Sequence, residues 1–225
     1  MVNEMMDRPI IDPEIQSYLR SHLSETNDPK LIELRKEAQL KGLPIIPLET
    51  ASFLRLLLKI HQPKRILEIG TAVGYSAILM TLENPVKTRI VTIERNPVMY
   101  QQAVKNIQKF GLTSQIKIID GDAANFYESF ESSEFDLIFL DGAKAKYLEQ
   151  FEHFFPSLKN NGLILIDDIF QGGDTLKPEA KIKHRNKGIH RHLNRLLDEV
   201  LAQKKSIATL LPVGDGLLVV QKTNK

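Results

Sequence analysis

The chain has 225 residues, of which 42% are hydrophobic and 26% are charged, an ordinary composition for one globular domain with modest additions. It contains no cysteine, which excludes disulfides, thiolate metal sites and a cysteine nucleophile. The net charge of +2 says little about partners, and no apolar run approaches the roughly 18 residues that span a bilayer. The charged stretch at residues 1–14 is unlike a secretory signal. We therefore expect a cytoplasmic protein without a membrane partner.

The first third of the sequence has the pattern of three helices. Asp12 and Asp28 each precede a proline and an apolar helical pattern, as N-cap residues do. The second of these helices should stop at Gly42, a typical C-terminal glycine. After the short extended piece LPIIP, a third helix is predicted from about Leu48 to Ile60.

From residue 65 the pattern changes to an alternation of strands and helices. The predicted strands are apolar runs at 65–70, 89–94, 115–122, 135–141 and 162–168. The predicted helices between them cover 75–82, 97–110, 125–129 and 147–158. Continuous apolar strands alternating with helices indicate a parallel sheet that is covered on both faces. Right-handed crossovers then give a doubly wound α/β sheet.

The last strands are predicted to form a β-hairpin. The apolar runs SIATLLPV and LLVVQK flank Gly214-Asp215-Gly216, a turn sequence. The hairpin makes the last strand antiparallel, so the whole sheet is expected to be seven-stranded and mostly parallel. We predict a single domain over 1–225, with residues 1–60 as an N-terminal helical cap and 65–225 as the α/β core.

The first predicted strand runs into a glycine-rich turn, Gly70-Thr71-Ala72-Val73-Gly74-Tyr75-Ser76. Glycines at a strand-to-helix turn let the backbone approach a ligand closely. The dinucleotide fingerprint Gly-x-Gly-x-x-Gly aims a helix at a pyrophosphate, whereas here the spacing is Gly-x-x-x-Gly. The absence of the middle glycine favours a cofactor that carries an amino acid and a nucleoside.

Acidic residues near the ends of the first three strands are candidates to bind such a cofactor. Glu94, at the end of the second strand, could accept both ribose hydroxyls, or it could be a solvated strand-end glutamate. Glu68 lies inside an apolar strand and needs a partner, which could be a cofactor ammonium, the turn amides or a lysine. Asp122-Ala123, after the third strand, lies where an adenine would be expected, with Asp122 as acceptor for the exocyclic amine.

Three aspartates follow two further strands: Asp141 after FDLIFL, and Asp167 with Asp168 after GLILI. In open α/β sheets ligands bind beyond these strand ends. Converging carboxylates would repel one another unless a cation balanced them. Hard oxygen ligands with open positions suit Mg²⁺ or Mn²⁺ better than zinc. The alternative is that the Asp167-Asp168 pair simply caps the following loop.

Taken together, RILEIGTAVGYSA, the acidic end of RIVTIE, GDA, FDLIFLDGAKAKY and GLILIDD resemble the cation-dependent O-methyltransferases that use S-adenosylmethionine. This group contains the catechol and caffeoyl-coenzyme A methyltransferases, and the match runs from about Leu43 to the C-terminal hairpin. Methyltransferases of this doubly wound type end in such a hairpin. The resemblance implies that Ile46 touches the cofactor. The predicted cofactor-binding residues are Ile46, Glu68, Gly70, Gly74, Ser76, Glu94, Asp122, Ala123 and Asp141.

The resemblance also implies a metal site and a general base. The metal ligands map onto Asp141, Asp167 and Asp168, and several relatives have Asn in place of Asp168. The lysine of the family's Asp-x-x-Lys motif maps onto Lys144, although Lys146 is close by. Asp141 and Lys144 are thus the predicted catalytic residues. Two adjacent substrate oxygens would chelate the metal, and Lys144 would take the proton of the attacking hydroxyl.

Within this group, GLPIIP and DGAKAKY look most like the bacterial tRNA 5-hydroxyuridine methyltransferases, which make 5-methoxyuridine at the wobble position. The segment between Lys177 and Arg195 holds seven cations and the single acid Glu179, which suits contacts with a phosphate backbone in the anticodon loop. The predicted RNA-binding residues are Lys181, Lys183, Arg185, Lys187 and Arg191.

Other interpretations of the substrate remain open. The basic segment could be a solvated helix face, in which case the substrate would be a small catechol-like molecule. His184, His190 and His192 could suggest zinc, but no cysteine or acidic partner accompanies them, which favours a polar surface. A non-enzymatic nucleotide-binding or RNA-binding module is the third hypothesis. Since relatives are often dimers, a homodimer is expected.

Overall fold

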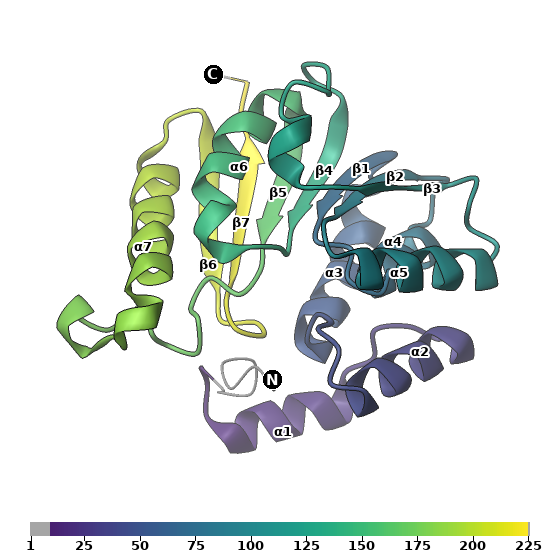
Figure 1. Ribbon diagram of the computed structural model, residues 1–225, viewed down its shortest axis with the longest axis horizontal. Helices are drawn as coiled ribbons and strands as arrows, with labels where there is room; N and C mark the ends of the chain where they lie inside the picture. The colour runs from purple at the N-terminus through teal and green to yellow at the C-terminus, as the bar shows by residue number, and fades with distance from the viewer. Residues whose placement is uncertain (1–9, 225) are drawn as a thin grey trace. The chain divides into compact units, whose positions relative to one another are not determined.

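The computed structural model describes residues 10–224, which divide into two compact units. The first unit is residues 17–126, and the second is residues 127–224 together with residues 10–16. Figure 1 shows the elements of both units, coloured along the chain. The third helix of the predicted cap and the first three strands of the predicted core therefore share a unit.

The unit of residues 17–126 contains a three-stranded parallel sheet in the order β3-β2-β1. Helix α5 packs against β2 and β3, while α4 packs against α2 and α3 as well as the sheet. Helix α4 is apolar nearly all round, which is typical of a helix inside a core, and most of its side chains are buried. The elements are α1 (Pro13–His22, which begins before the unit), α2 (Pro29–Leu40), α3 (Leu48–His61), β1 (Arg65–Ile69), α4 (Tyr75–Glu83), β2 (Arg89–Glu94), α5 (Pro97–Lys109) and β3 (Ile116–Asp120).

The predicted helix starts in this part of the chain are confirmed. The Asp12 carboxylate accepts the Glu14 N–H at 2.8 Å, and the Asp28 carboxylate accepts the Lys30 N–H at 2.8 Å. These bonds satisfy N–H groups that have no partner inside the helix. Gly42 follows α2 with φ of +61°, as a C-terminal glycine does.

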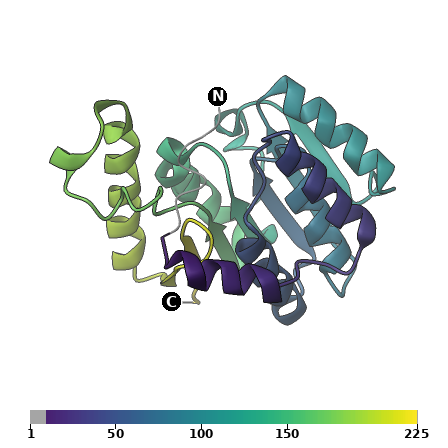
Figure 2. The same cartoon turned by 90° about the horizontal axis from the view of Figure 1, so that it is seen from below.

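The unit of residues 127–224 contains strands in the order β4-β5-β7-β6. Strands β4 and β5 are parallel, whereas β7 is antiparallel to both β5 and β6. Helix α7, the yellow-green helix at the left of Figures 1 and 2, packs against α6 and β6. The elements are β4 (Phe135–Leu140), α6 (Tyr147–Phe154), β5 (Leu158–Ile166), α7 (Lys187–Ala202), β6 (Ser206–Leu211) and β7 (Leu217–Lys222).

Two predicted helices are wrong in their extent. The helix expected at 125–129 is only a short 3-10 turn at Ala123–Phe126. The helix expected to reach residue 158 ends at Phe154, because Pro156 cannot continue it. Strand β5 then begins at Leu158 rather than at 162. Its first residues were not predicted, because residues 159–161 are polar and do not have the apolar pattern of a buried strand; Asn161 has φ of +63°.

The predicted fold class is confirmed. The described residues contain seven strands, with parallel pairing among the early ones and the expected antiparallel hairpin at the end. No helix within residues 10–224 is long and apolar enough to cross a membrane.

Candidate active site

The glycine-rich turn between β1 and α4 has a backbone that only small residues allow. Gly70 has φ of +98° and Gly74 has φ of +84°, in the left-handed region that disfavours side chains. A Cβ atom at Gly74 would also lie 3.4 Å from Ala103 of α5. The Gly-x-x-x-Gly spacing therefore sets the conformation of the turn, whereas a Cβ atom at Gly74 would make only an ordinary contact with Ala103.

Glu94 is part of this turn rather than a solvated strand-end residue. Its side chain is 8% exposed, and one carboxylate oxygen accepts the Ala72 N–H at 2.8 Å. The other oxygen accepts the Asn96 N–H at 2.7 Å. Each carboxylate oxygen can accept a second hydrogen bond. Glu94 can thus hold the turn and still receive the hydroxyls of a ribose.

Glu68 is completely buried in β1, two residues before Gly70, which begins the glycine-rich turn. The Thr92 hydroxyl donates to one of its oxygens, and the other oxygen has no hydrogen-bond partner. Burial raises the pKa of Glu68 to about 7, although hydrogen bonds from Ser76 and Thr92 oppose this change. A lysine was one of the partners that the sequence allowed for Glu68, but within residues 10–224 no lysine pairs with it.

The remaining predicted cofactor residues of this unit lie at the ends of its elements. Asp122 follows β3, and its carboxylate accepts the Ala124 N–H at 3.0 Å while its side chain stays half exposed. Ala123 and Ile46 are buried, at 5% and 2% exposure. Ser76 is buried in the first turn of α4. Their contacts with a cofactor stay predictions.

A buried network around Arg35 supports this end of the unit, and sequence reasoning missed it. The Arg35 guanidinium binds the Glu25 carboxylate at 2.9 Å, the Tyr75 hydroxyl at 2.8 Å and the carbonyl oxygen of Ile46 at 3.0 Å. It therefore joins α2 to the first residue of α4 and to the segment before α3. An arginine on a charged helix gives no sequence signal of this role.

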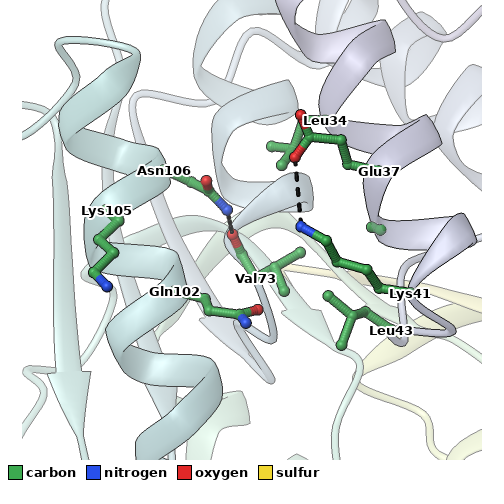
Figure 3. A pocket seen from close by; sticks show the side chains of 9 residues that line it. Leu34, Glu37, Lys41, Leu43, Val73, Gln102, Lys105 and Asn106 are labelled. Carbon is green, nitrogen blue, oxygen red and sulfur yellow. Dashed lines mark hydrogen bonds and ion pairs between the residues drawn. The ribbon is translucent and has the colours of Figure 1, made fainter.

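A pocket of about 240 Å³ lies beside the glycine turn, between α2 and α5 (Figure 3). Asn106 of α5 donates to the carbonyl oxygen of Val73 at 2.8 Å and so ties the turn to this helix. None of the predicted cofactor residues lines the pocket. The lining residues are Leu34, Glu37, Ala38, Lys41, Leu43, Val73, Gln102, Lys105 and Asn106.

In the unit of residues 127–224, the predicted metal ligands Asp167 and Asp168 follow β5. Asp167 is 1% exposed, and one of its oxygens accepts the Asp168 N–H at 2.9 Å while the other is buried without a partner. Burial and the charge of Asp168 raise the pKa of Asp167 well above its usual range. Asp168 has φ of +60°, a conformation that Asp and Asn tolerate better than most residues. An asparagine would therefore fit this backbone conformation as well.

Lys144 and Lys146 have different surroundings. The Lys144 ammonium lies 3.0 Å from an Asp168 oxygen and 3.6 Å from an Asp215 oxygen. Lys146 is half exposed and forms an ion pair with Glu149 at 2.7 Å. The geometry therefore favours Lys144 over Lys146 as the lysine that serves the aspartates.

Asp215 is a further residue of this cluster that the sequence did not reveal, since it was interpreted only as part of a hairpin turn. It is 6% exposed and accepts the Gly172 N–H at 2.6 Å. Burial raises its pKa to about 6, with the Gly172 hydrogen bond and the Lys144 charge opposing the rise.

The third predicted metal ligand, Asp141, is partly buried at the end of β4. Burial, and then the charges of Asp141, Asp168 and Asp167, raise the pKa of the buried Tyr147 hydroxyl. Within residues 10–224 no three His, Cys, Asp or Glu side chains are arranged to hold a metal as they stand. The chemistry of the donors nevertheless fits a hard divalent cation, because the buried Asp167 oxygen has no hydrogen-bond partner and Asp168 is a neighbouring carboxylate.

The predicted RNA-binding segment covers the stretch that precedes α7 and the first turns of α7 itself. Two short 3-10 turns, Glu179–Lys181 and His184–Asn186, precede α7, which Lys187 begins. Arg191 pairs with Glu179 at 3.2 Å. Lys181, Lys183 and Arg185 are exposed, whereas Lys187 is partly buried.

The three histidines of this segment do not share one environment. His184 and His192 are exposed, in agreement with a polar surface. His190 is buried, and its Nε2 lies 2.9 Å from the carbonyl oxygen of Lys177. The surface interpretation is therefore wrong for His190, which serves the packing of α7.

Comparison with known proteins agrees with the fold and identifies the family. The sequence profile of the O-methyltransferase family matches residues 21–223. A catechol O-methyltransferase of Niastella koreensis is 33% identical over 167 residues, which are 72% of this chain and 75% of the relative. A caffeoyl-CoA O-methyltransferase of Eucalyptus globulus is 28% identical, over 77% of this chain and 73% of its own. The SAH-bound methyltransferase PaMTH1 of Podospora anserina superposes with a TM-score of 0.83 at 26% identity, covering 94% of both chains. The chain belongs to the O-methyltransferase family.

Proposed function

We propose that this S-adenosylmethionine-dependent O-methyltransferase requires a divalent cation and methylates O5 of 5-hydroxyuridine in tRNA. The observation that carries the cation requirement is the buried, partnerless oxygen of Asp167 beside Asp168. Most of the predicted cofactor-binding residues belong to the unit of residues 17–126, whereas Asp141 and the predicted metal ligands belong to the unit of residues 127–224. The two substrate oxygens would be O5 and the neighbouring O4 of the base.

The cation would be held by Asp141, Asp167 and Asp168. When bound, Mg²⁺ or Mn²⁺ polarises the acceptor hydroxyl and orients the two adjacent oxygens. Burial and the charge of Asp168 hold the pKa of Asp167 well above its usual range, and a positive charge beside it would favour its ionised form. Asp168 is close enough to Asp167 for its charge to raise the pKa of that carboxyl group further.

The protein residues perform the proton transfer and the positioning. Lys144 is the general base: its Nζ takes up the proton of the acceptor hydroxyl, and Lys144 leaves this step as an ammonium. The oxygen then attacks the sulfonium methyl group, the bond between methyl carbon and sulfur breaks, and S-adenosylhomocysteine leaves. Glu68 receives the cofactor's ammonium group, and Glu94 receives its ribose hydroxyls. Because both reactants are held in place, much of the rate comes from orientation.

The cation requirement is tested with the full chain and labelled cofactor. We expect methyl transfer to stop when EDTA is added and to return with excess Mg²⁺. Asp167→Asn should lose activity while it keeps its fold and its cofactor affinity. Asp136→Asn is the matched control, because Asp136 lies near the start of β4 and pairs with Lys159 at 2.8 Å. Full activity in EDTA would refute the requirement, and equal cofactor affinity in all variants separates this result from misfolding.

The tRNA substrate is supported by the exposed cations that follow the aspartate pair. Lys181, Lys183 and Arg185 are exposed on the segment between β5 and α7. Positive side chains there can bind phosphates, and each phosphate contact makes binding weaken with salt. Arg191 contributes less than the sequence predicts, because its charge is already shared with Glu179.

A small catechol-like substrate is the second candidate, and the names of the relatives favour it. Methyl transfer to tRNA that bears 5-hydroxyuridine should be compared with transfer to catechol, each with and without Mg²⁺. For tRNA, exchange of both Lys181 and Lys183 for Ser should weaken binding. It should also lower the slope of the logarithm of the binding constant against the logarithm of the salt concentration by about one per cation removed. The control exchanges Lys204 and Lys205, which are exposed after α7. Methylation of catechol alone, unaffected by either pair, would refute the tRNA substrate.

The expected homodimer stays a prediction. Leu56 and Ile60 of α3 expose most of their apolar side chains, at 58% and 73%. Burial of such side chains favours association. Sedimentation at two protein concentrations would measure the oligomeric state, and a monomer at both would refute the dimer.

A further inference from the structure

We propose that Asp215 is a positioning residue, which holds the Lys144 ammonium when a divalent cation engages Asp168. Lys144 would thus pass from one carboxylate to the other as the cation binds and leaves. This role rests on the cation requirement of the proposed function. It assigns a task to a hairpin-turn aspartate that has no place in the predicted site.

The position of Lys144 between two carboxylates is the first observation. Its ammonium is 3.0 Å from the Asp168 oxygen and 3.6 Å from the Asp215 oxygen, and its side chain is only 18% exposed. The nearer partner is a predicted metal ligand. A divalent cation on Asp168 would repel the ammonium at this distance. Lys144 must then take another anionic partner or move into water, and Asp215 is already within ion-pair distance.

The rigid placement of Asp215 is the second observation. Its other carboxylate oxygen accepts the Gly172 N–H at 2.6 Å, and its carbonyl oxygen accepts the Phe170 N–H at 2.9 Å. The next carbonyl, that of Gly216, accepts the Ile169 N–H at 3.1 Å. The turn between β6 and β7 is therefore fastened to the chain that directly follows Asp168.

The turn between β6 and β7 lies so close to the residues after Asp168 that only glycine fits at position 216. A Cβ atom at Gly216 would lie 2.2 Å from the Phe170 ring, and Gly216 has φ of +90°. The turn cannot shift without breaking this packing. Asp215 consequently offers a fixed negative charge to Lys144, whichever partner Asp168 has.

The experiment measures Mn²⁺ binding to the full chain from the electron paramagnetic resonance signal of free Mn²⁺. Asp215→Asn removes the charge but keeps an oxygen to accept the Gly172 N–H. We expect Mn²⁺ binding to weaken about tenfold, because Lys144 then has only Asp168 as a partner and competes for it. In a Lys144→Met background the same exchange should change binding by less than about twofold. Asp136→Asn is the control for loss of one negative charge in this unit.

The outcomes separate this role from simpler ones. An equal loss in both backgrounds would mean that Asp215 attracts the cation directly, which overturns the positioning role but leaves the cation requirement intact. No Mn²⁺ binding by the unchanged chain would overturn both. A loss of kcat in Asp215→Asn with an unchanged KM for the cofactor, restored by Asp215→Glu, is the expected kinetic result. If Asp215→Asn does not fold, Asp215→Glu must still bind Mn²⁺ within about twofold of the unchanged chain, or the role is refuted.

Discussion

Burial of Glu68 should make the stability of the ligand-free protein fall as the pH rises. Its pKa is about 7 in the folded chain against an ordinary value of 4.5. Below the ordinary value the carboxyl group is protonated in both the folded and the unfolded chain. Between the two values the unfolded chain loses the proton and the folded chain keeps it. Unfolding therefore releases a proton in this range, and rising pH favours it.

The magnitude follows from the difference between the two pKa values. Each factor of ten in proton affinity is worth about 1.4 kcal/mol, so Glu68 lowers the free energy of unfolding by about 3 kcal/mol once the pH exceeds its folded value. Glu68→Gln has no such dependence, since its side chain does not ionise. An amide at this position can still accept the Thr92 hydroxyl through its oxygen.

Urea unfolding of the ligand-free chain and of Glu68→Gln at about pH 5 and about pH 8 measures this effect. Asp167 and Asp215 also have raised pKa values, and their contributions have the same sign in both proteins. The difference between the two proteins therefore isolates Glu68. We expect Glu68→Gln to gain about 2.5 kcal/mol relative to the unchanged chain between the two pH values, because a part of the effect is already present at about pH 5. The same difference at both pH values would refute the reasoning.

Three further predictions concern residues that hold the site in place. Arg35→Met should lower the free energy of unfolding by about 3–5 kcal/mol, because it leaves the Glu25 charge buried without its partner, and urea unfolding will measure the loss. Asn106→Ala should weaken binding of S-adenosylhomocysteine about tenfold in calorimetry by freeing the Val73 carbonyl, and unchanged affinity would contradict this. Gly216→Ala should lower the melting temperature, since its Cβ atom has no room and its φ of +90° disfavours alanine.

The sequence predicted the elements wherever local signals were strong. Prolines after Asp12 and Asp28 marked helix starts, and continuous apolar runs marked buried strands. It failed where a polar stretch belongs to a strand, at residues 159–161. There β5 continues because its pairing with β4 shifts register, and a tertiary contact of this kind leaves no periodic pattern.

The candidate site was predictable to the extent that its residues follow strands. Glu94 and the aspartates at strand ends could be placed from the alternation of strands and helices alone. Arg35 and Asp215 could not, because their roles depend on partners far away in the sequence. Nothing near Asp215 distinguishes an aspartate that shapes a turn from one that holds a lysine.

Both units share one electrostatic feature, which links ligand binding to proton release. Glu68 in one unit and Asp167 with Asp215 in the other are buried acids whose pKa values are raised. The proposed ligands are all cationic at these places: the cofactor ammonium at Glu68, and a divalent cation at Asp167. A positive ligand favours the ionised carboxylate, so binding of the cofactor ammonium should expel a proton from Glu68 when the pH lies below its folded pKa of about 7. Binding should therefore tighten as the pH rises through the same range in which the ligand-free chain loses stability. Calorimetry of S-adenosylmethionine binding in buffers of different ionisation enthalpy would count the proton released at Glu68, and Glu68→Gln should release none.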